Sequence, residues 1–126
     1  MNRSGIKPEH AFELYELIES LPGLHFKGLH GYDGHIRATD FTERKQHTDE
    51  AFALIKKLEE KIHAAQKESF TVVAGGSPTF PAHATRANVE CSPGTFVFWD
   101  WGYKTILPDE PFECAALVIT RIISII

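Results

Sequence analysis

The chain has 126 residues, of which 43% are hydrophobic and 24% are charged, a composition typical of one soluble globular unit with a substantial core. Lysine and arginine total 13 against 17 acids, so the net charge is −4. Without a basic cluster, this balance argues against nucleic acid as a partner. No apolar run reaches the roughly 20 residues of a membrane span and no signal pattern begins the chain, so we expect a cytoplasmic protein without membrane contact. Cys91 and Cys114 are far apart and form no C-x-x-C motif, which favours reduced thiols.

Two segments have the apolar spacing of helices. Lys7-Pro8-Glu9 opens the first, because proline suits a first turn and an acid there complements the helix dipole. Pro22-Gly23 ends this helix. The second helix spans about residues 43–66 and places one apolar stripe opposite a charged face.

Short β-branched and aromatic runs predict strands between and after these helices. We expect strands over residues 24–29 and 70–74, and extended segments over 88–91 and 95–101. Residues 114–126 form a strongly apolar run that is long enough for one or two more strands. Helices that alternate with short strands predict an α/β fold with a parallel sheet.

The most informative segment is residues 70–79, which read Phe-Thr-Val-Val-Ala-Gly-Gly-Ser-Pro-Thr. A buried strand that runs into two glycines and two hydroxyl residues can form an anion pocket, because glycines admit a phosphate and amides and hydroxyls bind it. Taken alone, the same residues also fit an ordinary Gly-Gly-Ser-Pro turn.

Four segments in order resemble one enzyme family. They are Asn2-Arg3-Ser4-Gly5-Ile6, Gly28-Leu29-His30-Gly31-Tyr32-Asp33-Gly34-His35, Ala74-Gly75-Gly76-Ser77-Pro78-Thr79 and Val89-Glu90-Cys91-Ser92-Pro93-Gly94-Thr95. Together they resemble the D-threonine aldolase and D-serine dehydratase family of fold-type III, alanine-racemase-like pyridoxal-phosphate enzymes. The resemblance implies that residues 1–108 form the second half of a (β/α)₈ barrel, which needs roughly 200–250 residues to close. Residues 109–126 would begin a truncated C-terminal β domain; the alternative is a small stand-alone α/β sandwich.

The resemblance implies pyridoxal 5'-phosphate as cofactor and a D-3-hydroxy amino acid as substrate. The implied activity is that of a D-threonine aldolase, which cleaves the substrate to glycine and an aldehyde. Alternatives are a D-serine dehydratase or amino-acid racemase, a non-catalytic phosphate-binding module, and an incomplete product that folds poorly alone. The resemblance also implies a homodimeric parent enzyme.

The family's Schiff-base lysine and its divalent-metal ligands are expected outside these 126 residues. The resemblance places the lysine on an earlier barrel strand and the metal ligands in the C-terminal domain. We therefore expect no catalytic residue and no metal ligand here, and no turnover by this chain alone.

The resemblance implies that one set of residues contacts the cofactor: Arg3, His30, Tyr32, Gly75, Gly76, Ser77, Thr79, Ser92 and Gly94. Residues 75–79 would hold the phosphate, and Ser92 and Gly94 would complete the cup. Tyr32 would contact the pyridine side of the cofactor, although it could also be a packed core residue. Arg3 would reach toward the pyridine nitrogen or the substrate carboxylate, or lie in solvent.

The remaining histidines and aromatic residues have simpler interpretations. His30 and His35 are five residues apart, which is no usual metal-ligand spacing, so a hydrogen-bonding role at the barrel mouth is favoured. His83 is interpreted as a loop histidine that could line the site, and Cys91 as a small buried hydrophobe. Trp99, Trp101 and Tyr103 alternate, which predicts three aromatics on one face of a strand.

Overall fold

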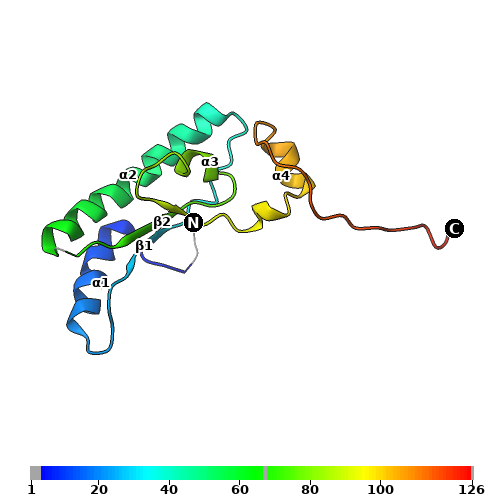
Figure 1. The fold of residues 1–126 in the computed structure, drawn as a ribbon. Helices are drawn as coiled ribbons and strands as arrows, with labels where there is room; N and C mark the ends of the chain where they lie inside the picture. Colours follow the sequence, from blue (N-terminus) through cyan, green and yellow to red (C-terminus); the bar gives the residue numbers. More distant parts are fainter. Residues whose placement is uncertain (1–3, 67, 126) are drawn as a thin grey trace.

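The computed structural model describes residues 4–66 and 68–125. Its centre is a three-stranded parallel sheet in the order β1-β2-β3 (Figure 1). The strands are β1 (Gly28–Gly31), β2 (Thr71–Ala74) and β3 (Glu90–Cys91). The helices are α1 (Pro8–Ser20), α2 (Phe41–Ala65), α3 (Phe80–His83) and α4 (Trp101–Ile106). Helices between parallel strands confirm the predicted α/β fold class.

Both predicted long helices are present. Pro8 stands in the first turn of α1, as expected from its fixed φ and missing N–H. Helix α2 begins two residues before the predicted start because Asp40 caps it, accepting a hydrogen bond from the Glu43 N–H at 2.9 Å.

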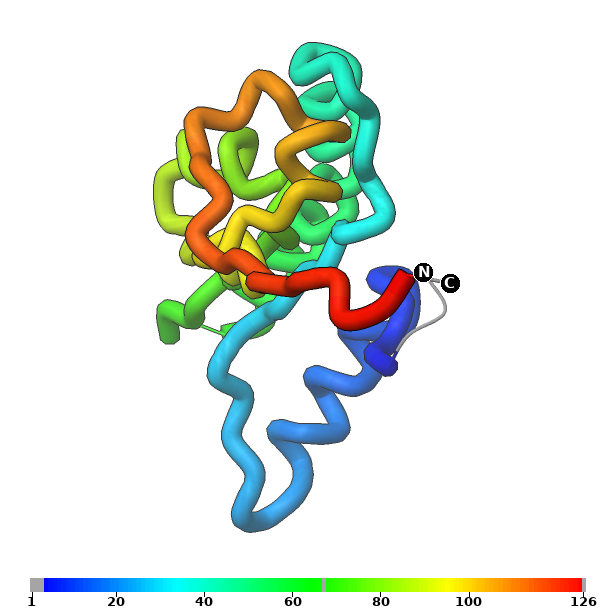
Figure 2. Tube along the Cα trace, turned by 90° about the vertical axis from the view of Figure 1, so that its right-hand side faces the viewer, coloured from blue at the N-terminus to red at the C-terminus, as the bar shows by residue number. Residues whose placement is uncertain are grey.

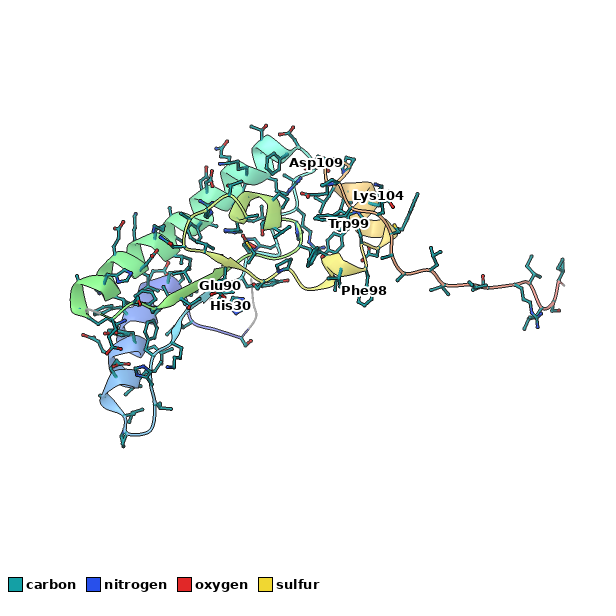
Figure 3. The ribbon with its side chains drawn as sticks, in the orientation of Figure 1. His30, Glu90, Phe98, Trp99, Lys104 and Asp109 are labelled. Carbon is teal, nitrogen blue, oxygen red and sulfur yellow. The ribbon has the colours of Figure 1, made fainter. Side chains whose placement is uncertain are left out.

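The core lies between α1, α2 and one face of the sheet. Tyr15 of α1 packs with Leu58 and Ile62 of α2, and Phe52 of α2 packs with Val72 and Ala74 of β2. The side chains that alternate with these point to the opposite face of the sheet. They include His30 of β1 and Glu90 of β3, which are labelled in Figure 3, lie on either side of Val73 of β2 and are both exposed. No described helix covers this second face.

Strand β1 begins later than predicted. Pairing with β2 starts at Gly28, opposite Thr71, so residues 24–27 form no strand. The backbones approach so closely there that a Cβ on Gly28 would lie 2.0 Å from the Thr71 carbonyl oxygen. Residues 2–6, the first segment of the family resemblance, are only partly described, and Ser4 and Gly5 form a bend without strand pairing.

The strand predicted over residues 95–101 is wrong. Residues Thr95–Val97 form a 3₁₀ helix (η1), and Asp100 then caps α4 by accepting a hydrogen bond from the Tyr103 N–H at 3.0 Å. The three alternating aromatics therefore share no strand face: Trp99 is 1% exposed, whereas Trp101 is 77% exposed. Trp99 instead stacks on Tyr103, with ring centroids 5.4 Å apart.

The strands predicted after residue 114 are also absent from the described residues 114–125. This segment runs away from the rest of the molecule, as the orange-to-red part of Figure 1 shows; in Figure 2 the same segment points toward the viewer. A strand needs a partner for its backbone groups, and only the Ala115 N–H finds one, on the Phe98 carbonyl oxygen at 2.8 Å. Among the described residues, no helix is long and apolar enough to cross a membrane.

Candidate functional site at the carboxyl edge of the sheet

Parallel strands bring distant parts of the sequence to one edge. Tyr32 follows β1, Gly75 follows β2 and Ser92 follows β3, so all three stand at the carboxyl edge of the sheet. Ligands of open α/β sheets and of barrels bind at this edge. The predicted site residues that the structure describes therefore lie within one region, and Arg3 lies outside the described residues.

Glycine is required where the chain leaves β2. Gly75 has a φ of +93°, and a Cβ there would lie 2.8 Å from Cδ2 of His83. Its N–H donates to the Gly31 carbonyl oxygen at 3.0 Å. The next N–H, of Gly76, donates to Asp33 Oδ1 and to Thr79 Oγ1, both at 3.0 Å. Both glycine amides are thus engaged within the protein.

Asp33 is the centre of the buried network behind this loop. Its Oδ1 also accepts a hydrogen bond from the Thr79 hydroxyl at 2.6 Å, and its Oδ2 accepts one from His83 Nε2 at 2.8 Å. Burial acts to raise the pKa of Asp33, yet this pKa lies below its ordinary value, and the hydrogen bonds from His83, Thr79 and Gly76 favour the charged form. Asp33 is therefore a carboxylate that faces the loop from inside the fold.

The partners of His83 determine which ring nitrogen carries the proton. Arg86 Nε lies 3.2 Å from His83 Nδ1, and an arginine N–H can only donate. Nδ1 must therefore accept, which assigns the proton to Nε2, the nitrogen that donates to Asp33. Arg86 is itself held by Asp49 of α2 and by the ring of Phe52, 4.3 Å from its guanidinium carbon.

A second set of hydrogen bonds joins the three strand ends on the exposed face. The Ser92 hydroxyl donates to the Gly75 carbonyl oxygen at 3.0 Å and lies 3.0 Å from His30 Nε2. Because the single hydroxyl proton goes to Gly75, His30 Nε2 donates to Ser92. His30 thus hydrogen-bonds at the strand ends.

Tyr32 lies beside the glycine loop. Its side chain is half exposed, and its hydroxyl oxygen would lie only 2.3 Å from a Cβ on Gly34. A Cβ on Gly76 would lie 3.2 Å from the Tyr32 ring. Glycines on both sides therefore leave room for this ring against the loop.

The donors that remain fit a phosphate ester. No hydrogen bond joins the N–H or the hydroxyl of Ser77 to another described residue, and the same holds for the Gly94 N–H. Ser77 directly follows the two glycines, and Gly94 has no atom within 4 Å of a Cβ position. In contrast, Thr79 is fully buried with its hydroxyl directed to Asp33. Ser77 and Gly94 can thus donate to an anion, whereas Thr79 supports the loop.

A cavity of about 560 Å³ lies near the glycine loop but is separate from it. It runs between α1, β1 and α2 and reaches Tyr32 and His83, but residues 75–79 do not line it. No group of three or more His, Cys, Asp or Glu in the described residues could hold a metal ion. Cys91 is half-buried, which raises the pKa of its thiol, and it forms no disulfide.

Three residues of the network were not among the predicted site residues. Asp33 stands next to Tyr32 in the motif after β1, and His83 and Arg86 are three residues apart, about one helical turn. The short spacing could have suggested a contact between the last two. Nothing in the sequence indicates that Asp33, 50 residues earlier, joins them.

Comparison with known proteins finds a matching family and a similar solved structure. Residues 1–100 match the family model of the alanine racemase N-terminal domain. The crystal structure of D-threonine aldolase from Filomicrobium marinum is similar over 95% of this chain, with a TM-score of 0.76 and 29% sequence identity. The match covers 34% of the aldolase, so the chain spans about a third of that protein. No curated protein matches the chain.

Proposed function

This chain belongs to the alanine racemase N-terminal domain family of pyridoxal-phosphate enzymes, and from that membership we propose that its loop 75–79 binds the phosphate of pyridoxal 5'-phosphate. The observation that carries the proposal is the position of Ser77. Its N–H and hydroxyl have no partner among the described residues, at the carboxyl edge where the three parallel strands end. Charge-assisted hydrogen bonds from such donors are the usual way to hold a phosphate.

Each residue of the edge has a distinct part in this proposal. Ser77 and Gly94 donate to phosphate oxygens, and Gly75 and Gly76 keep the approach free of side chains. Tyr32 borders the side of the loop toward the pyridine ring, and Ser92 holds the Gly75 carbonyl away from the anion. When bound, the cofactor supplies an electron sink for bonds broken at the substrate α-carbon.

For the enzyme to which this chain contributes, we infer cleavage of D-3-hydroxy amino acids to glycine and an aldehyde. The support is the 29% identity to a protein described as a D-threonine aldolase, over 95% of this chain. Elimination from D-serine and racemisation are the alternatives within the family. A module that binds the cofactor without turnover is the alternative outside catalysis.

Binding is tested with the 126-residue chain and pyridoxal 5'-phosphate in a titration calorimeter. We expect saturable binding that Ser77→Ala weakens about tenfold to a hundredfold, because one hydrogen bond to a charged group contributes about 1.5–3 kcal/mol. The matched control is Ser69→Ala, an exposed serine at the opposite end of β2. Equal affinity of wild type and Ser77→Ala would contradict the assignment of the loop.

The substrate is tested in a chimera in which this chain replaces the matching segment of the Filomicrobium marinum aldolase. Release of acetaldehyde from D-threonine supports the aldolase assignment, and release of pyruvate from D-serine instead supports a dehydratase. A soluble, cofactor-loaded chimera that does neither contradicts both. The same chimera with Ser77→Ala reports whether activity depends on the loop.

A further inference from the structure

We propose that Asp33 and His83 are positioning residues for the phosphate-binding loop, and that Arg86 makes this possible by setting the tautomer of His83. The inference rests on the proposed function of residues 75–79 and deepens it. It concerns the chain of hydrogen bonds that runs behind the loop, from Asp49 on α2 to Gly76.

The carboxylate of Asp33 fixes the position of the loop. It accepts from the Gly76 N–H, the Thr79 hydroxyl and His83 Nε2, so one group holds two residues of the loop and the helix that follows. Asp33, Thr79 and His83 are all less than a tenth exposed. Buried polar groups that are fully hydrogen-bonded hold one conformation, because every alternative leaves a donor or acceptor unpaired.

Arg86 fixes the tautomer of His83. With its proton on Nδ1, the ring would present a lone pair to the Asp33 carboxylate and an N–H to Arg86, so two acceptors and two donors would face each other. Arg86 Nε prevents this by donating to Nδ1 at 3.2 Å. Asp49 accepts from the Nη2 of the same arginine, and Phe52 lies under its guanidinium.

The network also determines which donors of the loop remain for the anion. The Gly76 N–H and the Thr79 hydroxyl both point inward to Asp33, so neither is available to a phosphate. Ser77, between them, keeps its N–H and hydroxyl unpaired within the described chain. Loss of the Asp33 contacts frees the loop to turn, and Ser77 then no longer holds a fixed direction.

The tautomer is read by ¹⁵N nuclear magnetic resonance of the His83 ring in the full chain. The proposal predicts a protonated Nε2 and an unprotonated Nδ1 in wild type. Arg86→Lys removes the Nε–H donor but keeps the charge, and we expect mixed tautomers and a shifted Gly76 amide signal. Arg121→Lys, in the exposed segment after residue 114, is the control and should change neither the tautomer nor the Gly76 signal.

The effect on the site is read as the affinity for pyridoxal 5'-phosphate. We expect Asp33→Asn and Arg86→Lys to weaken binding about tenfold, the order expected when a buried charged hydrogen bond is lost. Thr79→Ser keeps the hydroxyl and should bind with nearly wild-type affinity, whereas Thr79→Val should bind as weakly as Asp33→Asn. His83→Gln, whose amide N–H can replace Nε2–H, should bind more tightly than His83→Leu.

The outcomes separate this inference from the proposed function. If wild type binds the cofactor and the Asp33 and Arg86 variants keep both affinity and His83 signals, the positioning role is wrong and the loop assignment stands. If wild type does not bind it, yet Arg86→Lys alters the His83 tautomer and the Gly76 amide, the function is wrong and the hydrogen-bond chain stands. If Thr79→Ser, which keeps the hydroxyl, binds as weakly as Thr79→Val, the positioning role is wrong, whether or not the other weakened variants keep a folded amide spectrum.

Discussion

The charge of Asp33 links the stability of the fold to pH. Its folded-state pKa lies below the ordinary value of 3.8, so the carboxylate contributes stability that is complete above about pH 4. That contribution is lost as the pH falls through the lowered folded-state pKa.

The first prediction is therefore that wild type loses more unfolding free energy than Asp33→Asn between pH 5 and pH 2.5, because the asparagine cannot titrate. Urea denaturation followed by circular dichroism measures the two slopes. Asp100→Asn, an exposed helix cap, controls for a general effect of removing an acid. Parallel curves for wild type and Asp33→Asn would show that Asp33 does not stabilise the loop.

Gly75 carries a conformational demand that another residue meets only with strain. At a φ of +93°, with a Cβ 2.8 Å from the His83 ring, Gly75→Ala should destabilise the fold by about 1–3 kcal/mol. Gly94→Ala is the control, since its φ is −88° and no atom lies within 4 Å of its Cβ position. Thermal denaturation compares the two, and a Gly75→Ala midpoint equal to that of Gly94→Ala would contradict the expected strain.

Helix α2 is joined to the segment before the tail by a buried ion cluster. Arg44 Nη1 donates to the Ala38 and Thr39 carbonyl oxygens at 2.7 and 3.1 Å, and Nη2 donates to Asp109 and Glu110 at 2.5 and 3.0 Å. Burial, and then the neighbouring Asp109 charge, raise the pKa of Glu110 above its ordinary value. The ionised form of Glu110 therefore depends on the positive charge of Arg44.

Removal of this arginine should release the segment. We expect Arg44→Met to destabilise the fold by about 3–5 kcal/mol, because it leaves Glu110 buried without its cation. Urea denaturation followed by Trp99 fluorescence in a Trp101→Phe background measures the loss, since Trp99 is buried in the same segment. Lys57→Met on the exposed face of α2 is the control. A loss under 1 kcal/mol would mean that the cluster contributes little net stability.

The described part of the molecule consists of a folded α/β body and an exposed apolar tail, residues 114–125 (Figure 1). Six apolar residues of the tail are each at least 77% exposed: Leu117, Val118, Ile119, Ile122, Ile123 and Ile125. An exposed run of β-branched residues is a ready template for pairing with another chain.

Removal of residues 117–126 should therefore lower aggregation without changing the thermal midpoint of the body. Light scattering measures the first quantity and circular dichroism the second. The double variant Ile119→Lys, Ile123→Lys tests the same point at full length, and should behave like the truncation. A midpoint that falls by several degrees in both variants would show that the tail packs on the body.

Local patterns in the sequence were enough to predict the two long helices, the parallel α/β class and the family. Pro8 and the apolar stripe of residues 43–66 act within a few residues, so their effect is readable before folding. The turn after β2 was also readable, since two glycines directly after a strand permit the positive φ that Gly75 adopts.

The contacts between residues that are distant in the sequence could not be predicted from the sequence. Asp33 and His83 are 50 residues apart, and their contact exists because β1 and β2 pair in parallel and end at one edge. The structure of residues 95–101 also depends on the fold. Their alternating aromatics suit a strand, but Trp99 stacks on Tyr103 and packs in an aromatic cluster. Backbone preferences are local, whereas hydrogen-bond satisfaction and burial depend on which segments meet, and these long-range pairings exist only in the folded chain.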